Sequence, residues 1–101
     1  MVGIAMLMLD EYVVDVLMRD LVGHDRRPVS FLVYLWLAAE QQRLGSAVTV
    51  SYQQLAESVG ISKSSAQAAA GWLARRKLLT ISKAGSTATP TYSVQRPWQS
   101  K

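Results

Sequence analysis

Cysteine is absent from the 101 residues. This absence excludes a disulfide framework and every zinc or iron–sulfur site that needs cysteine thiolates, and it fits a reducing cytoplasm. Long apolar runs are absent as well. The apolar start MVGIAMLML covers nine residues, which is too short to span a bilayer, and it lacks the basic flank of a signal peptide. We therefore expect a cytoplasmic protein that makes no contact with a membrane.

Acidic side chains are scarce in the second half of the chain. Residues 43–101 hold eight basic side chains and one acid, Glu57, which sum to +7. Residues 1–42 hold three basic and six acidic side chains, which sum to −3. A charge split of this kind points to a polyanionic partner for the basic half, although a solvated basic face gives the same composition. Half of all residues are hydrophobic, so one domain with its own core is expected.

Groups suited to catalysis or metal binding are few. His24 is the one histidine, and its neighbours Asp20 and Asp25 do not complete a ligand set, so a solvated loop histidine is expected. In the basic half, Glu57 has no second acid or histidine with which to form an acid–base pair. We therefore expect no enzymatic activity, no metal site and no cofactor.

The first half of the chain predicts two helices. Residues Leu9–Val22 carry apolar side chains at helical spacing over a wide face, and Gly23 is a natural stop. A second helix is expected to open at Pro28 or Ser30 and to end before Gly45. Its centre, FLVYLWLAA, is apolar on every side, so it must be covered all round, by the domain or by a second subunit.

A small domain has too little surface to cover both apolar helices, and soluble monomers avoid large exposed apolar patches. A second copy related by a two-fold axis is the simplest cover. We therefore expect residues 1–27 to form a helical extension, and a homodimer to form through residues 1–44. The alternative is that the N-terminal helix folds over its own domain.

The second half predicts two short helices joined by a corner. Ser51, with Gln54 three residues later, forms a capping box for a helix that ends at Val59. Ser62 is expected to cap the next helix, which ends near Lys77. A short strand, AVTV (47–50), precedes this pair, and a strand–turn–strand hairpin, residues 78–94, follows it.

The corner between the two short helices has the residues that a tight crossing needs. Ala56 is small enough for the helices to approach closely, and Gly60 tolerates the positive φ of a sharp turn. The crossing is sealed by apolar side chains, namely Leu55, Val59, Ile61, Ala66 and Ala69. Residues 52–71 therefore resemble the helix-turn-helix of bacterial transcription regulators, in which the second helix enters the major groove.

Over residues 28–94 the resemblance extends to winged helix-turn-helix regulators, whose hairpin forms a wing. It implies a mainly α fold with a small β-hairpin: a helical core, a short three-stranded sheet and, here, an extra N-terminal helix. The domain is expected over residues 28–95, followed by a tail over residues 96–101. The implied function is sequence-specific binding of double-stranded DNA in transcription regulation, with helix 62–77 in the major groove and hairpin 78–94 as the wing.

The resemblance and the charge pattern select the residues expected to contact DNA. Lys63 and Gln67 face outward near the start of the second helix, where they can reach base edges. Serine hydroxyls suit phosphate oxygens, and the basic side chains attract phosphates without regard to sequence. The expected set is Ser51, Tyr52, Gln53, Ser62, Lys63, Ser64, Ser65, Gln67, Ala68, Arg75, Arg76, Lys83, Ser86 and Thr87.

Two small residues depart from the usual pattern of such regulators. Ala68 and Gly71 stand where many regulators place a longer polar side chain, so direct base readout is thin. Either the wing and DNA shape contribute the specificity, or the protein is a winged-helix interaction module that binds an acidic protein partner. Trp72 is expected to pack against the wing, and Trp98 in the tail to dock on the domain or on a partner.

Overall fold

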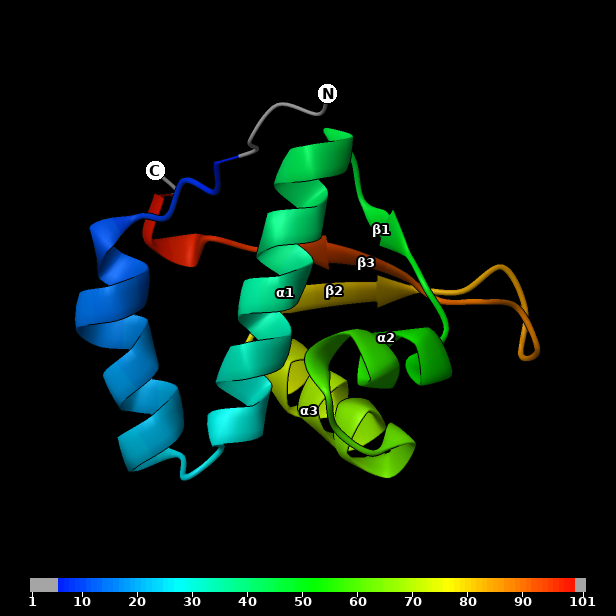
Figure 1. Ribbon diagram of the computed structural model, residues 1–101, viewed down its shortest axis with the longest axis horizontal. Helices are drawn as coiled ribbons and strands as arrows, with labels where there is room; N and C mark the ends of the chain where they lie inside the picture. Colours follow the sequence, from blue (N-terminus) through cyan, green and yellow to red (C-terminus); the bar gives the residue numbers. More distant parts are fainter. Residues whose placement is uncertain (1–5, 100–101) are drawn as a thin grey trace.

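Helix α1 (Pro28–Leu44) runs through the middle of the structure, a computed structural model that describes residues 6–99 (Figure 1). It begins at Pro28, where a proline needs no backbone partner, and ends at Gly45, which has a left-handed φ of 71°. Both boundaries confirm the sequence prediction. The buried side chains of α1 form the centre of the core: Ser30, Phe31, Val33, Tyr34, Leu37 and Ala38.

The helix that precedes α1 spans residues 11–24 and has π-type hydrogen bonding over Val13–Leu17 and Arg19–His24. It buries Val13, Leu17 and Leu21 against the domain. The predicted stop at Gly23 is wrong, because the helix continues to His24. The chain turns instead at Arg26, which has a positive φ of 57°.

The two short helices lie where the sequence predicts them. Helix α2 (Tyr52–Val59) starts with the capping box of Ser51 and Gln54, and Gly60 has a φ of 89°. Helix α3 (Lys63–Arg75) is capped by Ser62 and ends two residues before the expected Lys77. Lys77 has a left-handed φ of 65°, which the helix cannot continue through.

The sheet contains three antiparallel strands in the order β1-β3-β2. They are β1 (Val48–Thr49), β2 (Leu79–Ser82) and β3 (Thr91–Val94). Tyr92 on β3 lies opposite Val48 on one side and Ile81 on the other, and it is fully buried. The hairpin of β2 and β3 is the wing, and its loop projects beyond the body of the molecule in Figure 1. The predicted fold class, a mainly α winged helix with a small sheet, is confirmed.

Residues 97–99 of the C-terminal tail fold back onto the start of the N-terminal helix. The Trp98 indole donates a 2.8 Å hydrogen bond to the Asp10 carboxylate, and its ring stacks on Tyr12 with centroids 4.5 Å apart. Trp98 therefore docks on its own chain, one of the two alternatives left open by the sequence. Within residues 6–99 no helix is both long and apolar enough to cross a membrane.

Candidate nucleic-acid interface

Helix α3 has one buried face and one exposed face. Ala66, Ala69, Ala70 and Leu73 are buried, as the spacing predicts. The exposed face carries Lys63, Ser64, Gln67, Ala68, Gly71 and Arg75. This face offers one amide, one hydroxyl and two cations to a partner, and its small residues leave the backbone accessible.

The serine side chains at the start of α3 form hydrogen bonds with one another. Ser62 Oγ accepts a 3.1 Å hydrogen bond from the Ser65 backbone N–H, and it also bonds the hydroxyls of Ser64 and Ser65. The cap therefore holds the first turn of α3 rigid.

A hollow of about 210 Å³, termed here the wing hollow, lies between the starts of α2 and α3 and the wing. It brings together seven of the fourteen predicted contact residues: Ser51, Tyr52, Gln53, Lys63, Lys83, Ser86 and Thr87. Lys83 Nζ donates a 3.1 Å hydrogen bond to the Ser86 carbonyl, which closes the wing loop on itself. Two lysines and no acidic side chain line the wing hollow, and Gln53, which also lines it, donates a 2.9 Å hydrogen bond to Glu57.

The far end of α3 contacts the segment before α1. The Trp72 indole donates a 3.0 Å hydrogen bond to Asp25 Oδ2, and Arg76 Nε donates a 2.8 Å bond to the same oxygen. The sequence predicts that Trp72 packs against the wing, whereas its indole N–H bonds the segment before α1. The flank of α3 that carries Trp72 faces the segment before α1, whereas Lys63 lies beside the wing. Arg76 is thus engaged inside the chain, apart from the residues of the wing hollow.

Asp25 is the acid that organises this end of α3. Its side chain is 5 % exposed. Burial alone raises its pKa, but hydrogen bonds from His24 and Trp72 and the charge of Arg76 outweigh burial and hold the pKa below its ordinary value. Asp25 is therefore ionised near neutral pH and neutralises part of the local positive charge.

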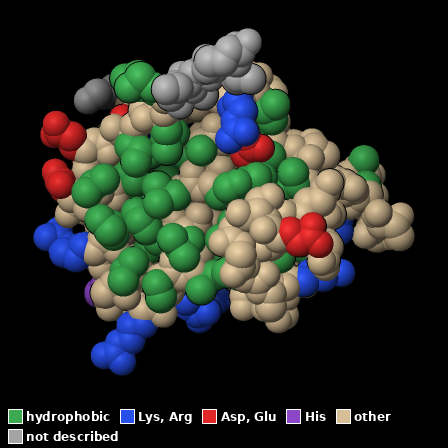
Figure 2. All heavy atoms as spheres, viewed as in Figure 1, with side chains coloured by type: hydrophobic (Ala, Val, Ile, Leu, Met, Phe, Trp, Pro, Cys, Tyr) green, Lys and Arg blue, Asp and Glu red, His purple; other side chains and the backbone are tan. Residues whose placement is uncertain are grey.

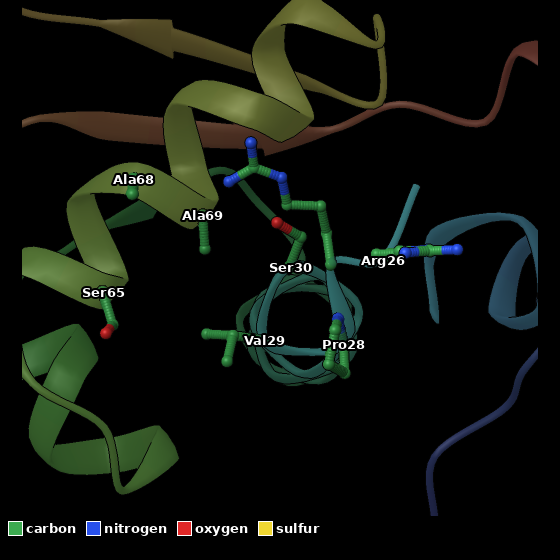
Figure 3. Close-up of a pocket in the computed structure, with 8 residues that line it drawn as sticks. Arg26, Pro28, Val29, Ser30, Ser65, Ala68 and Ala69 are labelled. Atoms are coloured by element: carbon green, nitrogen blue, oxygen red, sulfur yellow. The ribbon is translucent and has the colours of Figure 1, made fainter. Parts of the chain in front are cut away.

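A second hollow, of about 240 Å³, lies on the other flank of α3 and is termed the arginine hollow (Figure 3). Ser65, Ala68 and Ala69 of α3 line one side, and the start of α1 lines the other. Arg26 and Arg27 complete it, and neither was among the predicted contact residues. The basic pair in GHDRRP, directly before a proline-initiated helix, is the sequence signal that points to them.

Acid–base and metal chemistry find little support in the described part of the chain. Burial raises the pKa of Tyr34 to about 12, and it raises the pKa of the fully buried Tyr92 as well, so both phenols stay neutral. Within residues 6–99 there is no group of three or more histidine, cysteine, aspartate or glutamate side chains that could hold a metal ion.

Comparison with known protein families supports the same domain. The family model described as Winged helix-turn-helix domain (DUF2582) matches residues 41–89. This span runs from the end of α1 through α2 and α3 to the wing loop, and it includes both helices of the corner. No curated protein and no solved structure gives a significant match to the chain.

Proposed function

We propose that this chain, a winged helix-turn-helix protein, binds double-stranded DNA sequence-specifically and acts as a cytoplasmic, bacterial-type transcription regulator without enzymatic activity. Helix α3 enters the major groove with its exposed face toward the bases, and the wing contacts the flanking backbone.

The observation that carries the proposal is the convergence at the wing hollow. Residues that are distant in sequence, from the start of α2, the start of α3 and the wing, line one hollow that contains two lysines and no acid. A polyanion that follows α3 meets all three elements at once. This geometry supports a duplex more than a compact acidic patch on a protein, because one lysine comes from α3 and the other from the wing. The wing loop projects beyond the body of the molecule (Figure 1).

Two side chains of α3, Gln67 and Lys63, read the bases. Gln67 pairs with adenine through two hydrogen bonds, and Lys63 reaches guanine acceptors. Ala68 and Gly71 add no hydrogen bonds, but they allow α3 to approach the base edges closely. The remaining specificity then comes from the shape and deformability of the DNA.

We further propose that the protein acts as a homodimer through residues 1–44, of which residues 1–5 lie outside the described structure. Figure 2 shows hydrophobic side chains gathered over the N-terminal helix and α1. The large exposed apolar residues of this region are Met6, Leu7, Met8, Leu9, Tyr12, Val14, Val22, Leu32 and Leu44. A second copy that covers this face, termed the apolar face, would present two α3 helices to DNA, spaced by roughly one turn of the duplex.

Fluorescence polarisation with duplexes of different sequence, at about 50 and 200 mM salt, tests the DNA proposal. Affinity is expected to fall by orders of magnitude between the two salt concentrations if six or more phosphates are contacted. On a preferred site, Lys63→Ala and Gln67→Ala should each cost about 1–3 kcal/mol. Lys83→Ala in the wing should weaken all duplexes alike.

Arg43→Ala is a matched control, because Arg43 pairs with Glu40, lines neither the wing hollow nor the arginine hollow, and is not one of the residues of the apolar face. Light scattering checks that the variant keeps the oligomeric state of the parent. Its affinity for DNA should equal that of the parent. Absence of binding at low salt, or binding that does not depend on salt, would reject the DNA proposal and favour an acidic protein partner.

A further inference from the structure

The indole ring of Trp72 contacts two arginines from different parts of the chain. The guanidinium carbon of Arg27 lies 4.3 Å from the centre of the indole ring, and that of Arg75 lies 5.6 Å from it. Both distances fall within the range of cation–π attraction. Arg27 comes from the loop before α1 and Arg75 from the last turn of α3, so the ring holds together two positive charges that would otherwise repel each other.

The Asp25 carboxylate beside Trp72 already has hydrogen-bond partners. The Asp25 carboxylate, ionised near neutral pH, bonds Trp72, Arg76 and His24. Asp20 lines a hollow together with Arg76, so three guanidinium groups, those of Arg27, Arg75 and Arg76, stand near two carboxylates. This balance leaves a net positive charge. This excess favours an additional anion at the site.

Neither Arg27 nor Arg75 belongs to an ion pair among residues 6–99, where the pairs involve His24, Arg43 and Arg76. A guanidinium group has five N–H donors, and stacking on an aromatic face leaves the donors at its edge directed outward. Two such edges are suited to the oxygen atoms of a phosphate.

The arginine hollow provides room beside Arg27, which lines it. Pro28 and Val29 of α1 and Ala68 and Ala69 of α3 supply apolar lining, and Ser30 and Ser65 line it as well. In Figure 3 the α3 residues face the start of α1 across the hollow, whereas Arg26 extends away from α3. Apolar side chains beside a guanidinium group match a sugar–phosphate unit, whose deoxyribose is largely apolar and whose phosphate is charged.

We infer that Arg27 and Arg75, held by Trp72, bind a backbone phosphate of the DNA strand that passes on the side of α3 opposite to the wing. The inference rests on the proposed function and adds a second backbone contact to it. The wing hollow engages one strand and the arginine hollow the other, so that α3 is seated between the two strands of the major groove. Arg27 and Arg75 are binding residues, and Trp72 is a positioning residue.

Salt dependence of binding by the full chain measures this contact. Affinity falls as salt rises, and each lost phosphate contact makes the plot of log affinity against log salt shallower by about 0.9. A lower slope below means a shallower plot. Arg27→Gln should lower the slope by about that amount and weaken binding to all duplexes alike, whereas Arg27→Lys should retain most of the slope. Arg43→Ala, which removes the same charge at the other end of α1, should leave the slope unchanged.

Two substitutions of Trp72, one aliphatic and one aromatic, test its role in positioning the arginines. Trp72→Leu removes the aromatic face and should lower the slope as Arg27→Gln does. Trp72→Phe keeps a face for the arginines and should restore the slope, although it loses the hydrogen bond to Asp25. Melting temperatures of all variants identify the temperature at which each is folded, and binding is compared below it.

The outcomes separate this inference from the proposed function. If the parent binds with a steep salt slope and Arg27→Gln has the same slope as Arg43→Ala, the phosphate contact is overturned while DNA binding stands. A slope that falls equally in Trp72→Leu and Trp72→Phe would show that Trp72 acts through stability and not through the arginines. If the parent binds no duplex, the proposed function itself fails.

Discussion

The Trp72 indole donates a 3.0 Å hydrogen bond to the Asp25 carboxylate, which lies 47 residues earlier in the chain. This bond ties the end of the N-terminal helix to the C-terminal half of α3. Residue 25 lies before the span matched by the winged-helix family model. The position of α3 therefore depends partly on residues outside that span.

Asp25→Asn tests the strength of this tie. The buried carboxylate accepts bonds from Trp72 and from the charged Arg76, and such charge-assisted bonds contribute about 1.5–3 kcal/mol each. An amide of the same shape retains at most part of this stabilisation. At neutral pH, chemical denaturation should show a loss of about 2 kcal/mol in the free energy of unfolding. Asp15→Asn, on the exposed side of the N-terminal helix, is the control and should leave stability unchanged.

The same tie predicts acid sensitivity. The pKa of Asp25 in the folded protein lies below its ordinary value of 3.8, so the folded state binds this proton less tightly than the unfolded state does. The stabilisation is complete above pH 3.8 and is lost as the pH falls through the lowered pKa. The stability difference between the parent and Asp25→Asn should therefore shrink in that window. A difference that stays constant down to acid pH would contradict this assignment.

Two glycines of the corner region should respond to alanine in opposite directions. Gly60 has a φ of 89°, and a Cβ there would meet nothing within 4 Å, so Gly60→Ala should cost about 1 kcal/mol through backbone strain alone. Gly71 lies in α3 with equally open space around a Cβ, so Gly71→Ala should stabilise by about 0.5–1 kcal/mol. Thermal melting of the two variants measures both effects. Equal shifts of the same sign would show that the strain at Gly60 is misassigned.

Lys77→Gly should stabilise the protein. Lys77 has a φ of 65° directly after α3, and the Leu78 backbone N–H reaches back to the Leu73 carbonyl with a 2.9 Å bond. This hydrogen-bonding pattern is the one in which helices commonly place glycine. Relief of the strain should raise the free energy of unfolding by about 0.5–1 kcal/mol. Lys83→Gly, which removes a charge from the wing instead, should not produce this gain.

If the apolar face is the dimer interface, a charged side chain placed on it should prevent dimer formation. Leu32 on α1 is 47 % exposed, and a carboxylate there would be desolvated in a dimer interface. Leu32→Asp should convert the dimer to a monomer of 11.1 kDa in light scattering after size exclusion, whereas Leu32→Met should remain dimeric. A parent protein that is already monomeric at micromolar concentration would reject the dimer.

The local features of the fold could be predicted from the sequence because each depends on residues within a few positions of one another. The capping box of Ser51 and Gln54, the serine cap at Ser62 and the left-handed Gly60 all belong to this class. Together with the strand–turn–strand pattern of residues 78–94, they determine the helix-turn-helix and the hairpin. They also determine which face of α3 is buried, since the period of a helix places its apolar residues on one side.

The arrangement of the site was decided by tertiary contacts. The sequence does not show that Trp72 meets Asp25, that Gln41 bonds the Val94 backbone, or that Trp98 reaches Asp10, because these pairs lie 47, 53 and 88 residues apart. Each is satisfied only when packing of the apolar core has brought the elements together. The same packing places half of the predicted contact residues around the wing hollow and directs Arg76 to Asp25. Hydrophobic patterning specifies which faces are buried, but the choice among polar partners depends on distances that exist only in the folded chain.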